Sequence, residues 1–95
     1  MIVADFSMIP MGEGPSASRY VRAIHQVLKE SGLNFVPGPM STALEAESME
    51  EIFDIIKDAN KALAQLGVQR IVTSLKIDYR TDKDISIDTK MSAIR

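Results

Sequence analysis

"GPMSTALEAESMEE", residues 38–51, holds a turn, a strand and the start of a helix in direct succession. Apolar and polar residues alternate through its middle, which predicts a β-strand with one buried side. Glu45 and Glu47 then lie on the same, unburied side of that strand. Ser48 and Glu51 follow as an S-x-x-E capping box, so a helix is expected to begin there.

Two longer helices are predicted from apolar residues at helical spacing. The first covers residues 18–31 and ends at Gly32; its buried stripe is expected to be Val21, Ile24 and Leu28, with Tyr20 and Val27 at the edges. The second begins at the capping box and ends before Gly67; its apolar face is expected to be Ile52, Ile56, Ala59, Leu63 and Leu66, flanked by Met49 and Phe53.

Three further strands are predicted from alternation or from short apolar runs, at residues 1–10, 33–37 and 70–80. A short C-terminal helix is expected from about Ser86. The order is therefore β-α-β-β-α-β in a single domain of 95 residues (1–95), an α+β ferredoxin-like sandwich. Two helices with one apolar stripe each cover one face of a four-stranded antiparallel sheet, and its other face is left open.

The open face is predicted by taking the side chains that point away from the helices. It collects Val3, Asp5, Ser7, Ile9, Ser41, Ala43, Glu45, Glu47, Val72, Ser74, Lys76 and Asp78. Burying the Glu45 carboxylate without a partner would be costly, so we expect it to meet Lys76 or a ligand donor. Two interpretations stay open: a structural Glu45–Lys76 ion pair inside an interface between subunits, or a polar ligand pocket. Val3, Ile9 and Val72 on this face favour self-association.

Composition excludes several classes of function. There is no cysteine and one histidine, which argues against disulfides and zinc sites. The net charge of −2 with no basic run argues against nucleic-acid binding. No apolar run reaches the ~20 residues needed to span a bilayer, and no signal peptide is recognisable. We expect a soluble, cytoplasmic protein without a cofactor.

Four motifs in order resemble the family of small thiamine-binding proteins: "IPMGEGPSASRYV", "GPMSTALEAES", "RIVTSLKIDYR" and a late "KMSAI". The resemblance covers nearly the whole chain, although Ser41 and Ala46 stand where glycine is common in the family. It implies a ferredoxin-like fold, dimers formed through the sheets, further association into tetramers, and binding of thiamine or its hydroxymethylpyrimidine half without catalysis. Matched by motif, the family pattern falls on Pro10, Gly12, Ser18, Tyr20, Met40, Thr42, Glu45, Lys76, Asp78, Arg80 and Lys90.

The chemistry of thiamine suggests roles for some of these residues. Glu45 is the first candidate, because a carboxylate accepts from the exocyclic amine of the pyrimidine. Asp5 or Glu47 would balance the thiazolium charge, and Ser7 or Ser18 would orient a ring. The predicted ligand-binding set is Glu45, Asp5, Ser7, Ser18, Thr42 and Lys76. The alternative is a structural or regulatory homo-oligomer with no ligand. An enzyme using Glu45 and Asp5 as an acid–base pair is disfavoured, because the sequence holds no nucleophile–base–orienter set.

Overall fold

The computed structural model describes residues 1–12, 14 and 18–94, and within them the chain forms four strands and three helices. In chain order these are β1 (Ile2–Pro10), α1 (Ser18–Ser31), β2 (Phe35–Pro37), β3 (Thr42–Ala46), α2 (Met49–Gln65), β4 (Ile71–Asp78) and α3 (Ile87–Ser92). None of the helices in these ranges is long and apolar enough to cross a membrane.

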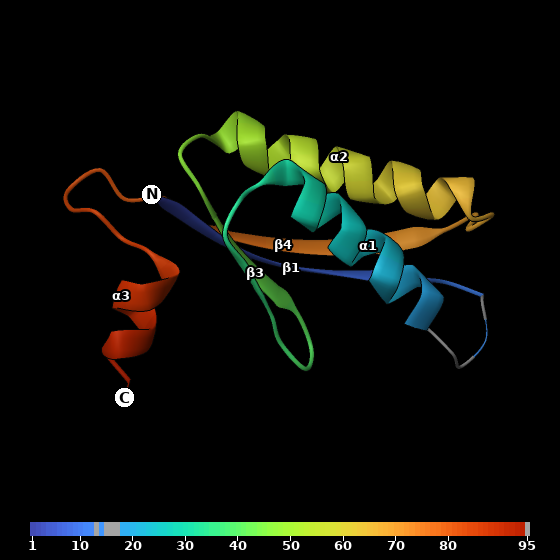
Figure 1. Ribbon diagram of the computed structural model, residues 1–95, viewed down its shortest axis with the longest axis horizontal. Helices are drawn as coiled ribbons and strands as arrows, with labels where there is room; N and C mark the ends of the chain where they lie inside the picture. Colours follow the sequence, from blue (N-terminus) through green and yellow to red (C-terminus); the bar gives the residue numbers. More distant parts are fainter. Residues whose placement is uncertain (13, 15–17, 95) are drawn as a thin grey trace.

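The strands form one antiparallel sheet in the order β2-β3-β1-β4, and α1 and α2 lie together on one of its faces (Figure 1). This confirms the predicted ferredoxin-like arrangement, with β1 between β3 and β4. The predicted faces of the strands are also confirmed. Phe6 and Leu44 are buried under the helices, whereas Asp5 and Glu45 point to the other side.

The main core lies between the sheet and the two long helices. Its largest fully buried side chains are Leu28, Leu44, Ile52 and Leu63. Two details of the predicted helix stripes were wrong. In α1, Tyr20 is buried and Val21 is exposed, because Tyr20, Ile24 and Leu28 follow one line of i, i+4 spacing. In α2, Ile55 is buried, whereas Ile56 is only partly buried and Phe53 is exposed on the flank.

Local signals fix both ends of α2. The Ser48 hydroxyl accepts a hydrogen bond from the Glu51 N–H at 3.2 Å, and the Glu51 carboxylate accepts one from the Ser48 N–H at 3.2 Å. This is the predicted capping box. Gly67 follows the helix with φ of 93°, a conformation that side chains with a Cβ rarely adopt.

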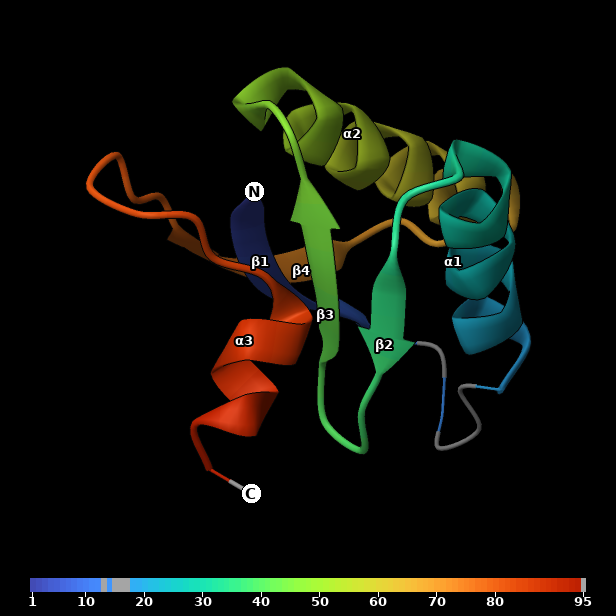
Figure 2. The same cartoon turned by 60° about the vertical axis from the view of Figure 1, so that its left-hand side comes forward.

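The helix α3 lies on the face of the sheet opposite α1 and α2, beside β3 (Figure 2). Ile85 and Ile87 are buried against Val3 and Ala43 there. The helix itself was predicted, but its position was not. The face that we expected to be open is therefore covered at one end, and Asp5, Ser7, Ile9, Val72, Ser74 and Lys76 lie beyond that cover.

Candidate functional site

The strands of the sheet differ in length, and the difference leaves a notch beside β1. β3 pairs with β1 from Ala46 opposite Ile2 to Thr42 opposite Phe6 and goes no further. β4, in contrast, accompanies β1 to Pro10, which lies opposite Ile71. The last four residues of β1, 7–10, therefore have a strand on one side only.

Within the notch, the backbone of Met8 presents a donor and an acceptor in the plane of the sheet. The Met11 N–H donates to the Arg70 carbonyl at 2.8 Å, so the odd-numbered residues of β1 are hydrogen-bonded to β4. Successive residues of an antiparallel strand direct their N–H and C=O groups to opposite sides. The N–H and C=O of Met8 therefore face the notch, and within the described residues no backbone group bonds to them.

The notch contains a hollow of about 200 Å³. Its walls come from β1, from the middle of α1 and from the turn between β2 and β3. They comprise Phe6, Ser7, Met8, Val21, Ile24, His25, Gly38, Pro39, Met40, Ser41 and Thr42. The turn is tight, because the Gly38 N–H donates to the Ser41 carbonyl at 2.8 Å. The notch therefore combines an apolar wall, several hydroxyl groups and an open strand edge.

A second hollow of about 200 Å³ lies on the open face between β1 and β4, lined in part by Asp5, Ser7, Ser74 and Lys76. Asp5 lies directly opposite Lys76, and Ser7 lies opposite Ser74. Ser7 lines both hollows, which places it at their junction. The structure thus brings Asp5, Ser7, Thr42 and Lys76 of the predicted set to two adjoining hollows.

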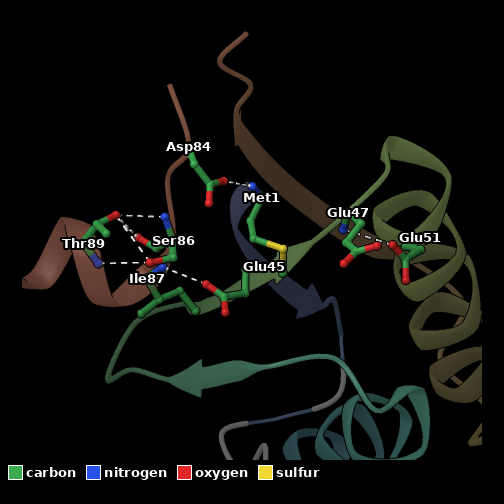
Figure 3. A network of polar contacts seen from close by, with 8 residues as sticks. All are labelled: Met1, Glu45, Glu47, Glu51, Asp84, Ser86, Ile87 and Thr89. Carbon is green, nitrogen blue, oxygen red and sulfur yellow. Dashed lines mark hydrogen bonds and ion pairs between the residues drawn. The ribbon is translucent and has the colours of Figure 1, made fainter. Parts of the chain in front are cut away.

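Glu45 lies on the predicted face of β3, but its partners differ from the one that we expected. Its carboxylate accepts a hydrogen bond from the Ile87 N–H at 2.8 Å (Figure 3). It accepts another from the Asn34 side chain at 3.0 Å. Ile87 is the first residue of α3, so Glu45 satisfies a backbone donor that no residue within that helix can reach. Within one chain the partner of Glu45 is therefore α3, whereas Lys76 lies across from Asp5. The role of Glu45 in ligand binding stays a prediction.

Ser18 also lies apart from the two hollows. It is the first residue of α1 and is exposed, and neither hollow includes it among its walls. Part of the neighbouring predicted loop, residues 13 and 15–17, lies outside the described residues. The Met8 backbone and the His25 side chain were not predicted as parts of a site. The alternation of β1 gave no signal for them, because only the register against β3 shows where pairing ends.

Charged contacts fasten the C-terminal segment at the far end of the sheet. The N-terminal ammonium of Met1 pairs with Asp84, Arg80 with Asp82, and Lys90 with Asp78. The hydrogen bond from the Met1 ammonium holds the pKa of the Asp84 carboxyl below its ordinary value. The hydrogen bond between Arg80 and Asp82 lowers the pKa of the Asp82 carboxyl and raises that of the guanidinium. Lys90 is the one residue of these pairs that belongs to α3, and none of the six residues lines either hollow.

Comparison with known proteins gives a consistent picture. A sequence profile of a family described as thiamine-binding protein matches residues 4–95. A UPF0045 protein of Methanothermobacter thermautotrophicus is 36% identical over 96 residues, which cover 100% of this chain and 97% of that protein. The crystal structure of a Methanocaldococcus jannaschii protein, 40% identical, superposes with a TM-score of 0.87 over 98% of this chain and 94% of that one. That of a candidate thiamine biosynthesis/salvage protein of Thermotoga maritima, 28% identical, has a TM-score of 0.85 over 99% and 98% of the two chains.

Proposed function

Because the chain belongs to the thiamine-binding protein family, we propose that it binds thiamine or the hydroxymethylpyrimidine half of thiamine, without catalysis. The observation that carries the proposal is the match of that family over residues 4–95, together with a notch whose polar groups suit a pyrimidine. The absence of a catalytic activity is part of this proposal.

The notch supports binding of the aminopyrimidine ring. A 4-aminopyrimidine presents an N–H donor and a ring-nitrogen acceptor side by side. The Met8 backbone presents the complementary pair, a C=O acceptor and an N–H donor directed to the same side of β1. The ring would thus take the place that the next residue of β3 would have occupied. Ile24 and Val21 provide an apolar wall for the ring, and Ser7 and Thr42 offer hydroxyl groups at its rim.

The open face supports binding of the thiazolium ring. This ring carries a permanent positive charge, which needs a carboxylate nearby. Asp5 lies on the same face of β1 as Ser7, two residues before it, in the adjoining hollow. Lys76 is exposed and makes no ion pair within the part of the chain that the structure describes, so its flexible side chain is free to move away from the ring. Hydroxymethylpyrimidine would then bind in the hollow of the notch alone, whereas thiamine would occupy both hollows.

Calorimetric titration with thiamine, with hydroxymethylpyrimidine and with an analogue that lacks the exocyclic amine tests the proposal. We expect saturable binding of the first two and about 5- to 150-fold weaker binding of the third, because an unpaired Met8 carbonyl costs about 1–3 kcal/mol. No heat with either ligand at several temperatures, together with no thermal protection, would refute the proposed function.

The substitution Met8→Pro addresses the backbone donor directly. Proline removes the N–H that faces the notch, and it spares the hydrogen bonds to β4, which the odd-numbered residues make. Met8→Ala is the matched control, because it loses the same side chain but keeps the N–H. We expect the pyrimidine affinity to fall about tenfold in Met8→Pro relative to Met8→Ala. Equal affinities would exclude the notch as the pyrimidine site.

Asp5→Asn separates the two halves of the ligand. It keeps the size of the side chain and removes the charge, so thiamine should bind more weakly while hydroxymethylpyrimidine binds as before. Equal weakening of both ligands would contradict the placement of the thiazolium ring at Asp5.

Self-association through the open face is the second candidate role. Ile9 and Val72 lie opposite each other on that face and are 52% and 40% exposed, an apolar pair that a second sheet would cover. Ile9→Asp should lower the mass measured by sedimentation at micromolar concentration, whereas Gln69→Asp, off the sheet, should not. An unchanged mass would exclude this interface.

A further inference from the structure

Two methionines and the single histidine of the chain line the hollow of the notch. Met8 comes from β1, Met40 from the turn between β2 and β3, and His25 from the middle of α1. Thioether sulfur atoms favour soft ions such as Cu(I), and an imidazole nitrogen also suits copper. Among the described residues that line the hollow none is an aspartate or a glutamate, so Ca²⁺ or Mg²⁺ would find no carboxylate ligand there.

The register of the sheet brings the two thioether side chains to the same hollow. β1 and β3 pair as far as Phe6 opposite Thr42, and the same register two residues further would set Met8 opposite Met40. The chain turns there instead, and both side chains border one hollow. Residues directly opposite each other in a sheet have Cβ atoms about 4.5–5.5 Å apart, and an unbranched thioether side chain adapts to a gap of this kind.

The two thioether side chains differ in how firmly they are held. Met8 packs against the main core and is partly buried. Met40 is 86% exposed, so few contacts hold its side chain in one position. An exposed methionine has three rotatable bonds and loses little packing when it changes rotamer. Met8 would therefore provide a fixed ligand, and Met40 a ligand that closes over an ion from the turn.

The His25 imidazole completes the set from the side of the helices. The centroid of its ring lies 6.3 Å from that of the Phe35 ring, at an interplanar angle of 41°, and this contact limits rotation of the imidazole. Within the part of the chain that the structure describes, His25 makes no hydrogen bond, so a ring nitrogen is available to a metal ion. The three donor groups thus come from three separate elements that meet at the notch.

We propose that the notch binds a Cu(I) ion through the sulfur atoms of Met8 and Met40 and a ring nitrogen of His25. Cu(I) accepts a trigonal set of two thioethers and an imidazole, whereas structural Zn²⁺ sites are almost always tetrahedral and lack thioether ligands. The site goes beyond the proposed function and does not depend on it. Because titration with Cu(I) uses no pyrimidine, either proposal can fail while the other holds.

Anaerobic titration of the full chain with Cu(I), in competition with the chromophoric chelator bicinchoninate, measures the affinity. The chain contains no cysteine, so no thiolate of its own competes for the ion. We expect one Cu(I) per chain. Replacement of a ligand, in Met8→Leu, Met40→Leu or His25→Gln, should lower the affinity at least about tenfold, because loss of even an outer-shell partner costs about 10–100-fold.

Two other methionines provide matched controls. Met11 and Met91 are each 40% exposed and do not line the hollow. Leucine keeps the approximate volume of methionine, so Met11→Leu and Met91→Leu should fold and should bind Cu(I) as the wild type does. Equal losses of affinity in these controls and in the ligand variants would show adventitious binding to exposed thioethers and would overturn the proposal.

NMR of the methionine methyl groups locates the ion in the wild-type chain, so this readout does not depend on the folding of any variant. Ag(I), a surrogate for Cu(I) that needs no reductant, should shift the methyl signals of Met8 and Met40. The signals of Met11 and Met91 should stay in place. The proposal is overturned if Met8 and Met40 do not shift, if any ligand variant keeps the wild-type affinity, or if Zn²⁺ binds as tightly as Cu(I).

Discussion

Replacement of Glu45 by alanine should release α3 from the sheet. The Glu45 carboxylate accepts two hydrogen bonds, from the Ile87 N–H at 2.8 Å and from the Asn34 side chain at 3.0 Å. Hydrogen bonds to charged groups contribute about 1.5–3 kcal/mol, and loss of a helix cap costs about 0.5–2 kcal/mol. Glu45 is only partly buried, so solvent replaces part of this contribution. We expect Glu45→Ala to lower the free energy of unfolding by about 1–2 kcal/mol.

Two measurements check this prediction. Urea unfolding gives the free energy, and amide exchange reports on Ile87, whose N–H bonds to Glu45 and not to its own helix. Glu45→Gln should lose about half as much, because the amide oxygen still accepts a neutral hydrogen bond. Glu47→Ala is the matched control, an exposed neighbouring acid whose loss should stay within about 0.5 kcal/mol. If Ile87 exchanges at the wild-type rate in Glu45→Ala, the carboxylate does not hold α3.

Substitutions at three further positions, Gly38, Gly67 and Asp84, test other parts of the fold. In Gly38→Ala a Cβ would lie 2.8 Å from the Ser41 carbonyl oxygen, so the turn beside the notch must open. We expect the free energy of unfolding to fall by about 1–3 kcal/mol. An unchanged midpoint of thermal unfolding would contradict this. Gly67→Ala should cost about 1 kcal/mol at φ of 93°, and Gly67→Asn should cost less in the same assay; the reverse order would be unexpected. Asp84, with its lowered pKa, should stabilise the fold above its ordinary pKa and lose that contribution as pH falls through the lowered value. In Asp84→Asn the free energy of unfolding should therefore fall less steeply as the pH is lowered than it does in the wild type. The same pH dependence in both proteins would rule this contribution out.

Much of the fold could be predicted from local patterns in the sequence. The alternation of β1, β3 and β4 assigned each side chain to the correct face, and the capping box at Ser48 and Glu51 located the start of α2. Both signals depend on residues that are close together in the chain, where geometry is fixed by backbone periodicity. The position of Val21 in α1 was predicted wrongly, because periodicity alone does not decide how far a helix is rotated about its axis.

The site was predicted less completely, because it depends on contacts between distant parts of the chain. Asp5, Ser7 and Lys76 were placed together correctly, since the topology makes β1 and β4 neighbours. Glu45 accepts a hydrogen bond from the backbone N–H of Ile87, and the pattern of side chains in a sequence does not predict which backbone N–H group a carboxylate will meet. The notch at Met8 arises from the register and unequal lengths of strands, which the sequence specifies only through long-range pairing.

The central position of β1 has a consequence for the folding of the chain during synthesis. β1 is made before the other strands, whereas its neighbour β4 is made after α2. Val3 of β1 therefore cannot pair with Asp78 of β4 until nearly the whole of this sequence has been synthesised. Domains made from the N-terminus therefore pass through a stage in which a finished strand has at least one open edge. Contacts between residues this far apart in the sequence also slow folding, because the entropy of loop closure is lost before the contact stabilises the chain. Until β4 has been made, the strand that later lies in the middle of the sheet keeps one edge open.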